Sequence, residues 1–99
     1  MIIITGKIEV TAAAQQAFRA LAETQVTNSR AEDACLSYHY YEDAMSPGTF
    51  FFYEQWRDEQ GVKFHFSQDY CRQFVAGLGA LGISSAAPSI MTAKDIEIS

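Results

Sequence analysis

Apolar and polar residues alternate over the first ten positions of the chain, as expected for a strand with one buried face. The side expected to face the core carries Ile2, Ile4, Ile8 and Val10. Gly6 falls on the same side, and its missing side chain leaves room there for a helix or a ligand. The chain is therefore expected to begin with a strand that has a gap in the middle of its apolar face.

After this strand the apolar residues recur every three or four positions, which predicts an amphipathic helix. Thr11 belongs to the residue types that cap helix N-termini, and the pattern continues to about Arg30. The inner face of this helix is expected to carry Ala14, Phe18, Leu21, Ala22 and Gln25.

Two aromatic-rich runs, residues 35–42 and 49–57, flank a loop of Asp, Ser, Pro and Gly, and together they predict a β-hairpin. If the loop is tight, the numbers of paired residues add up to about 92. One face of the hairpin then pairs Tyr38 with Glu54, Tyr40 with Phe52, and Leu36 with Trp56. The other face carries His39, Tyr41, Phe51 and Tyr53.

The remainder of the chain predicts two short helices and a last strand. Asp58 is expected to cap a helix that ends near Phe66, and Ser67 to cap the next helix. The apolar stripe of this second helix consists of Tyr70, Phe74, Leu78 and Leu81. Pro88 precedes a final strand that is expected to run through Ile90, Thr92, Lys94, Ile96 and Ile98.

The order β-α-β-β-α-β, with its second helical region split in two, predicts a ferredoxin-like α+β fold. Such a fold has a four-stranded antiparallel sheet with its helices on one face, and we expect residues 1–99 to form this single domain. The face with Tyr41 and Phe51 would remain as a large exposed apolar patch. The simplest cover is the same face of a second copy, so we expect a homodimer in which the two sheets form a barrel.

Composition excludes several classes of function. The chain is 48% hydrophobic and only 19% charged, which argues against disorder. The net charge is −5 and there is no Lys/Arg cluster, so neither nucleic acid nor an anionic membrane surface is an expected partner. No apolar run approaches the roughly 20 residues that span a bilayer, and residues 1–7 have neither the basic region nor the long apolar region of a signal peptide. We therefore expect a cytoplasmic protein with a small-molecule or protein partner.

One histidine stands out as candidate chemistry. His65 follows the aromatic strand within an apolar patch that includes Phe64, although a histidine in such a place can also be a hydrogen-bonded core residue. Cys35 and Cys71 have no CxxC spacing and no histidine at a convincing local spacing, so we expect both to be reduced and buried, with a nucleophilic thiol as the alternative. Nucleotide, haem and metal-ligand motifs are absent from the sequence, which predicts no cofactor and no metal.

These residues resemble the antibiotic biosynthesis monooxygenase family, which consists of dimeric α+β-barrel proteins and includes quinol monooxygenases. The similarity extends over nearly the whole chain, from the first strand (ITGKIEV) through CLSYHYYED to Phe74. Its most specific part is the pattern Glu54-x-Trp56-x-Asp58-Glu59 followed by His65.

The resemblance implies oxygenation of a small phenol or quinol by dioxygen, without a cofactor. A base removes the hydroxyl proton, and a dry aromatic pocket holds the reactive anion. His65 is the implied base and Glu54 a second catalytic or orienting group. The implied substrate-binding walls are Tyr38, Tyr40, Phe52, Phe64 and Trp56.

Two alternatives from other classes stay open. Some relatives are isomerases of a small phosphorylated signalling metabolite, for which Lys63 and Arg72 are the cations nearest to His65 in the sequence. The third interpretation is a non-catalytic dimeric module that binds a small ligand.

Overall fold

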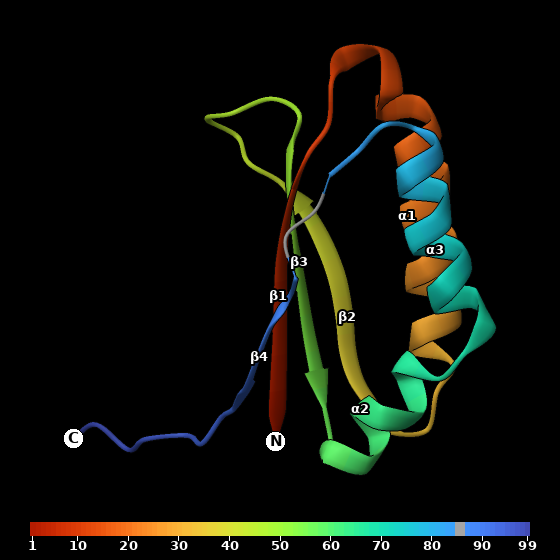
Figure 1. Cartoon of the computed structure of the whole chain (residues 1–99). Coiled ribbons are helices and arrows are strands. Elements are labelled where there is room, and N and C mark those ends of the chain that lie inside the picture. The colour runs from red at the N-terminus through yellow and green to blue at the C-terminus, as the bar shows by residue number, and fades with distance from the viewer. Residues whose placement is uncertain (85–86) are drawn as a thin grey trace.

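A computed structural model describes residues 1–84 and 87–99 and confirms the ferredoxin-like fold. The elements are β1 (Ile2–Glu9), the short 3-10 helix η1 (Ala12–Ala14), α1 (Gln15–Arg30), β2 (Cys35–Glu42), β3 (Thr49–Trp56), α2 (Glu59–Phe66), α3 (Asp69–Ala80) and β4 (Ser89–Thr92). The strands form one antiparallel sheet in the order β2-β3-β1-β4. Helices α1, α2 and α3 all lie on the same side of this sheet (Figure 1).

The core lies between the sheet and these helices. Alternation along β1 is as expected, because Ile2, Ile4 and Ile8 are buried on the helix side. Phe18 of α1 is completely buried and packs against Phe50 with ring centroids 4.7 Å apart. The core is therefore built by the apolar residues that alternate along the strands and by those that recur at helical spacing in α1.

The hairpin register agrees with the prediction except at one end. Tyr38 pairs with Glu54 and Tyr40 pairs with Phe52. The prediction that Leu36 faces Trp56 is wrong, because a bulge between Cys35 and Ser37 pairs Cys35 with Trp56 instead. The extra residue turns Leu36 away from the core, and 56% of it is exposed.

Two expectations for the second half of the chain are also wrong. Ser67 ends α2, where its hydroxyl donates to the carbonyl oxygen of Phe64, and Gln68 occupies the N-cap of α3. The last strand stops at Thr92, so Lys94, Ile96 and Ile98 lie outside it. The reason is the register: Thr92 pairs with Ile2, where β1 begins, and residues beyond Ala93 have no backbone of β1 to pair with. The final segment leaves the sheet (Figure 1).

Helix α2 is held close to the start of β2 by Gly61. A Cβ atom at this position would lie 2.3 Å from the Cβ atom of Ala34, which cannot move without moving the backbone. We therefore expect Gly61→Ala to lower the free energy of unfolding by about 2 kcal/mol, in the range for overpacking. Gly79→Ala is the matched control, because a Cβ atom there meets nothing within 4 Å and is expected to stabilise α3 slightly. Urea denaturation measures both; equal effects would contradict the close contact.

Candidate functional site

A cavity of about 160 Å³ lies between the sheet and the helices. Its apolar walls come from Ile4, Ile8, Phe52, Phe66, Phe74, Val75, Leu78 and Pro88. Its polar lining residues are Lys7, Gln25, Tyr38, Glu54, His65 and Cys71. Gly6 also lines it, and a Cβ atom there would touch nothing within 4 Å, so the gap expected on β1 opens into this space.

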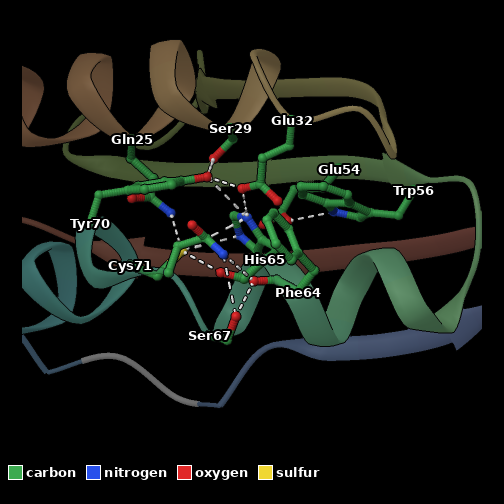
Figure 2. Close-up of polar contacts among 11 residues, drawn as sticks. Gln25, Ser29, Glu32, Glu54, Trp56, Phe64, His65, Ser67, Tyr70 and Cys71 are labelled. Carbon is green, nitrogen blue, oxygen red and sulfur yellow. Dashed lines mark hydrogen bonds and ion pairs between the residues drawn. The ribbon is translucent and has the colours of Figure 1, made fainter.

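His65 lies at the end of α2 and is held by an acidic residue from the loop after α1. Its Nδ1 atom is 2.7 Å from Oε2 of Glu32, and only 2% of the His65 side chain is exposed. An ionised carboxylate can only accept, so Nδ1 carries the hydrogen and donates it, and Nε2 is left with a free lone pair. The imidazole packs on Trp56, with ring centroids 4.4 Å apart (Figure 2). This arrangement fixes both the orientation and the tautomer of a potential base.

A second donor reaches the same carboxylate oxygen. The hydroxyl of Tyr70 donates to Oε2 of Glu32, and it also lies 3.4 Å from Oγ of Ser29 (Figure 2). Burial and the hydrogen bond to Glu32 raise the pKa of Tyr70, so this phenol stays a neutral donor. Within residues 1–84 and 87–99, Oε1 of Glu32 has no hydrogen-bond partner. The carboxylate is thus held through one oxygen by two donors.

Glu54 is a second acidic group in the cavity. It is buried in β3, and its Oε1 atom accepts a hydrogen bond of 3.0 Å from Nε1 of Trp56. Burial raises the pKa of Glu54 from 4.5 to about 7, with a smaller contribution from the negative charge of Glu32, while the hydrogen bond from Trp56 opposes the shift. At neutral pH a large fraction of this carboxyl group is therefore protonated and able to donate.

The shifted pKa gives Glu54 a predictable effect on stability. Between pH 4.5 and about 7 the folded chain keeps this proton while the unfolded chain loses it, so stability falls as the pH rises through this window. In the wild type this lowers the free energy of unfolding by about 3 kcal/mol, since one pKa unit corresponds to about 1.4 kcal/mol. We expect Glu54→Gln to lack this loss of stability. The measurement is urea denaturation at a pH below 4.5 and at a pH above 7.

The control for this prediction is Glu23→Gln, which removes one carboxylate from the exposed side of α1. It is expected to leave the pH dependence of the wild type in place. If wild type and Glu54→Gln instead lose stability in parallel as the pH rises, Glu54 is not a protonated group in the folded chain.

The structure brings together four of the residues proposed from the sequence. Tyr38, Phe52, Glu54 and His65 all line the cavity. Trp56 does not line it, because it is completely buried behind His65 and Glu54, where it supports both.

Tyr40 and Phe64 also lie outside the cavity, contrary to their expected role as walls. Tyr40 stacks on Phe52 with a centroid separation of 5.5 Å and packs toward Phe18 on α1. Phe64 is 59% exposed. It directly precedes His65 on α2, and the step of about 100° around the helix axis turns its side chain outward, away from the cavity.

Three polar residues at the site, Gln25, Glu32 and Tyr70, were not predicted from the sequence to be part of it. Cys71 was expected as a buried thiol, with nucleophilic chemistry as the alternative, but without a link to His65. Glu32 is 33 positions from His65, and no short motif connects them. The separation of six between His65 and Cys71 would place them on different faces of one continuous helix. The break between α2 and α3 brings Sγ of Cys71 to 3.5 Å from Nε2 of His65. Of the two thiols, Cys71 is buried as expected, whereas Cys35 is only half-buried.

Lys63 and Arg72, the cations considered for a phosphate ligand, do not line the cavity. Arg72 instead donates to Asp69 and to the carbonyl oxygen of Ser67. Within the described parts of the chain, no three His, Cys, Asp or Glu side chains are grouped to hold a metal ion. In those same parts, no helix has the length and apolar character needed to cross a membrane.

Comparison with known proteins finds both sequence relatives and structural neighbours. Residues 1–77 match the family model described as antibiotic biosynthesis monooxygenase. "Uncharacterized protein sll1783" of Synechocystis is 36% identical over 74 residues, which are 75% of this chain and 50% of that protein. The chain thus spans half the length of this relative. "Putative monooxygenase YcnE" of Bacillus subtilis is 33% identical over 76 residues, which are 77% of this chain and 80% of that protein.

Solved structures agree over almost the full length. A crystal structure described as "a putative antibiotic biosynthesis monooxygenase" from Deinococcus radiodurans has a TM-score of 0.93 at 26% identity, and the match covers 100% of this chain and 99% of that chain. Rv0793 from Mycobacterium tuberculosis has a TM-score of 0.84 at 26% identity, with 96% of both chains covered.

Proposed function

The chain belongs to the antibiotic biosynthesis monooxygenase family, and we propose that it oxidises a small phenol or quinol with dioxygen, without a cofactor. In this proposal His65 is the base, Glu54 is the acid, and Tyr38 and Phe52 are walls of the substrate site. The observation that carries the proposal is the imidazole of His65, anchored at Nδ1 by Glu32 and facing a largely apolar cavity.

The size of the cavity favours a single aromatic ring. Its volume of about 160 Å³ is close to that of an engineered apolar cavity of about 150 Å³ that binds benzene. Apolar walls also exclude water, which protects a reactive anion from side reactions.

The proposed reaction begins with proton transfer from the substrate hydroxyl to Nε2 of His65, while Glu32 stabilises the resulting imidazolium. The electron-rich anion reduces dioxygen, and a new C–O bond forms at a ring carbon. Breaking the O–O bond leaves one oxygen atom on the ring as a carbonyl group and releases the other as water. Insertion of one oxygen atom oxidises the ring by two electrons, and formation of the second carbonyl group removes two more. Dioxygen accepts all four electrons, so a phenol is converted to a quinone and one water molecule is released.

Glu54 is suited to the second half of this reaction. The departing oxygen must gain a proton as the O–O bond breaks, and a carboxyl group with a pKa of about 7 can supply one at neutral pH. Trp56 holds the other oxygen of this carboxyl group at 3.0 Å and so orients it.

We also propose that the protein works as a homodimer. The face of the sheet opposite the helices carries Tyr41, which is 56% exposed, and Phe51, which is 44% exposed. Among the residues that the structure describes in one copy, no helix covers this face (Figure 1). A second copy related by a two-fold axis would bury it and close the barrel.

Single-ring quinols provide the test of the proposed activity. We would incubate the protein with hydroquinone and methylated hydroquinones, with isotopically labelled dioxygen in one arm and without oxygen in the other. One labelled oxygen atom in the product, and no turnover without oxygen, are the expected results. Oxygen-independent turnover of a phosphorylated metabolite would indicate an isomerase, and tight binding without turnover would indicate a binding module; both contradict the proposal.

A further inference from the structure

Cys71 occupies the position of a nucleophile relative to His65. Its Sγ atom lies 3.5 Å from Nε2, the ring nitrogen that does not contact Glu32, and 3.8 Å from Nδ1. The imidazole is therefore in contact with both the thiol and the carboxylate of Glu32 that orients it (Figure 2). A thiol within reach of an imidazole that a third group orients is the arrangement found around base-activated nucleophiles.

The thiol also faces a space in which a ligand can reach it. Cys71 lines the same cavity of about 160 Å³ as His65. The amide nitrogen of Gln25 donates to Sγ at 3.5 Å. The other end of that amide, Oε1, has no hydrogen-bond partner among residues 1–84 and 87–99, although only 4% of Gln25 is exposed. This buried acceptor beside the thiol is available to a bound molecule that carries a hydrogen-bond donor.

We propose that Cys71 is a nucleophilic residue that adds covalently to a single-ring quinone or a similarly small α,β-unsaturated carbonyl compound in this cavity. The proposal goes beyond oxygenation and does not depend on it, because the addition requires no oxygen. It assigns Cys71 a role in capturing electrophiles that fit the space next to His65.

The addition is balanced without any other reactant. Nε2 of His65 takes the proton from Sγ as the sulfur forms a bond to a ring carbon that is conjugated with the carbonyl group. The electrons of the carbon–carbon double bond move to the carbonyl oxygen, which receives the proton from the imidazolium. Loss of the ring hydrogen at the attacked carbon to the second carbonyl oxygen restores aromaticity, and the product is a hydroquinone thioether. Its new hydroxyl groups are donors of the kind that Oε1 of Gln25 lacks.

The environment of Cys71 decides how it is activated. Burial raises the pKa of its thiol, so the resting group is S–H rather than a preformed thiolate. The thiol also lies 3.2 Å from the carbonyl oxygen of His65, which accepts its hydrogen. The S–H group therefore has to turn from this carbonyl oxygen toward Nε2 of His65 before the proton can be transferred. Deprotonation accompanies the attack, and the rate of addition depends on the imidazole.

Labelling with 1,4-benzoquinone in the absence of oxygen tests the proposal, with Cys35 as an internal comparison. Cys35 is the more exposed thiol, and burial raises its pKa to about 11. Intact-mass measurement and peptide mapping would follow both sites over time. We expect Cys71 to gain one benzoquinone before Cys35 does, and Cys71→Ser to abolish this fast phase.

The dependence of the Cys71 labelling rate on His65 tests the proposal more sharply than the order of labelling. His65→Gln and Glu32→Gln are expected to slow labelling of Cys71, by roughly a hundredfold for His65→Gln. In His65→Gln, Cys35 is expected to keep its wild-type rate and so to report that the chain is folded. Glu32→Gln also removes a negative charge that raises the pKa of Cys35, so Cys35 is not expected to slow there. Equal rates at the two thiols, or a Cys71 rate that neither variant changes, would overturn the proposal. Because the assay contains no oxygen, its failure leaves the oxygenase proposal untouched.

Discussion

His65→Gln is expected to lower turnover of a quinol substrate by about a hundredfold to ten-thousandfold, the range that a positioned general base contributes. Glutamine was chosen because the structure shows His65 buried against Glu32. Its amide N–H can replace the donor to the carboxylate, whereas alanine would leave a buried acceptor without a partner and lower stability as well. Glutamine has no basic nitrogen, so only the proton transfer is lost.

Chemical rescue with imidazole distinguishes a role of His65 as the base from a purely structural role. In His65→Ala the space of the imidazole is vacated, and added imidazole is expected to restore part of the turnover. His39→Ala is the control, because the other histidine lies on the opposite face of the sheet and contacts Arg30. It should keep wild-type turnover at concentrations where the protein stays associated. Full turnover of His65→Gln from pH 6 to 8 would transfer the role of base to another group, with Glu54 as the next candidate.

The elements of the fold could be read from the sequence because they follow from local periodicity. Ile2, Ile4 and Ile8 alternate over a whole strand, and the burial of all three is what such alternation predicts. The bulge that turns Leu36 outward has no such signal, because it depends on how β2 meets β3 over a single residue. The early end of β4 depends likewise on where its partner strand begins.

The candidate site could be predicted only as far as its strand residues. Tyr38, Phe52 and Glu54 share one parity of the hairpin, so a correct register placed them on one surface. Glu32 is different: it enters the site from the loop after α1, 33 positions from His65, and only the tertiary fold brings the two together. Cys71 has no histidine at a convincing local spacing in the sequence, and the break between α2 and α3 is what brings its thiol to His65.

Phe51→Asp is expected to dissociate the proposed dimer. Phe51 lies on β3, an inner strand of the sheet, and is 44% exposed in one copy. A buried carboxylate without a partner costs roughly 2 kcal/mol or more, and a two-fold axis introduces the change twice. A loss of about 4 kcal/mol corresponds to a dissociation constant about a thousandfold higher. Analytical ultracentrifugation should show the wild type near twice the 11.0 kDa of one chain and the variant near one chain.

Phe64→Asp gives this experiment its matched control. Phe64 is the more exposed of the two, at 59%, but it lies on α2, on the helix side of the sheet. The same substitution there changes charge and hydrophobicity equally without reaching the open face, so the variant is expected to stay dimeric. If instead Phe64→Asp dissociates the protein and Phe51→Asp does not, the copies associate through their helices. A monomeric wild type at micromolar concentration would remove the barrel altogether, because the aromatic residues of the open face would then be exposed to water in the working protein.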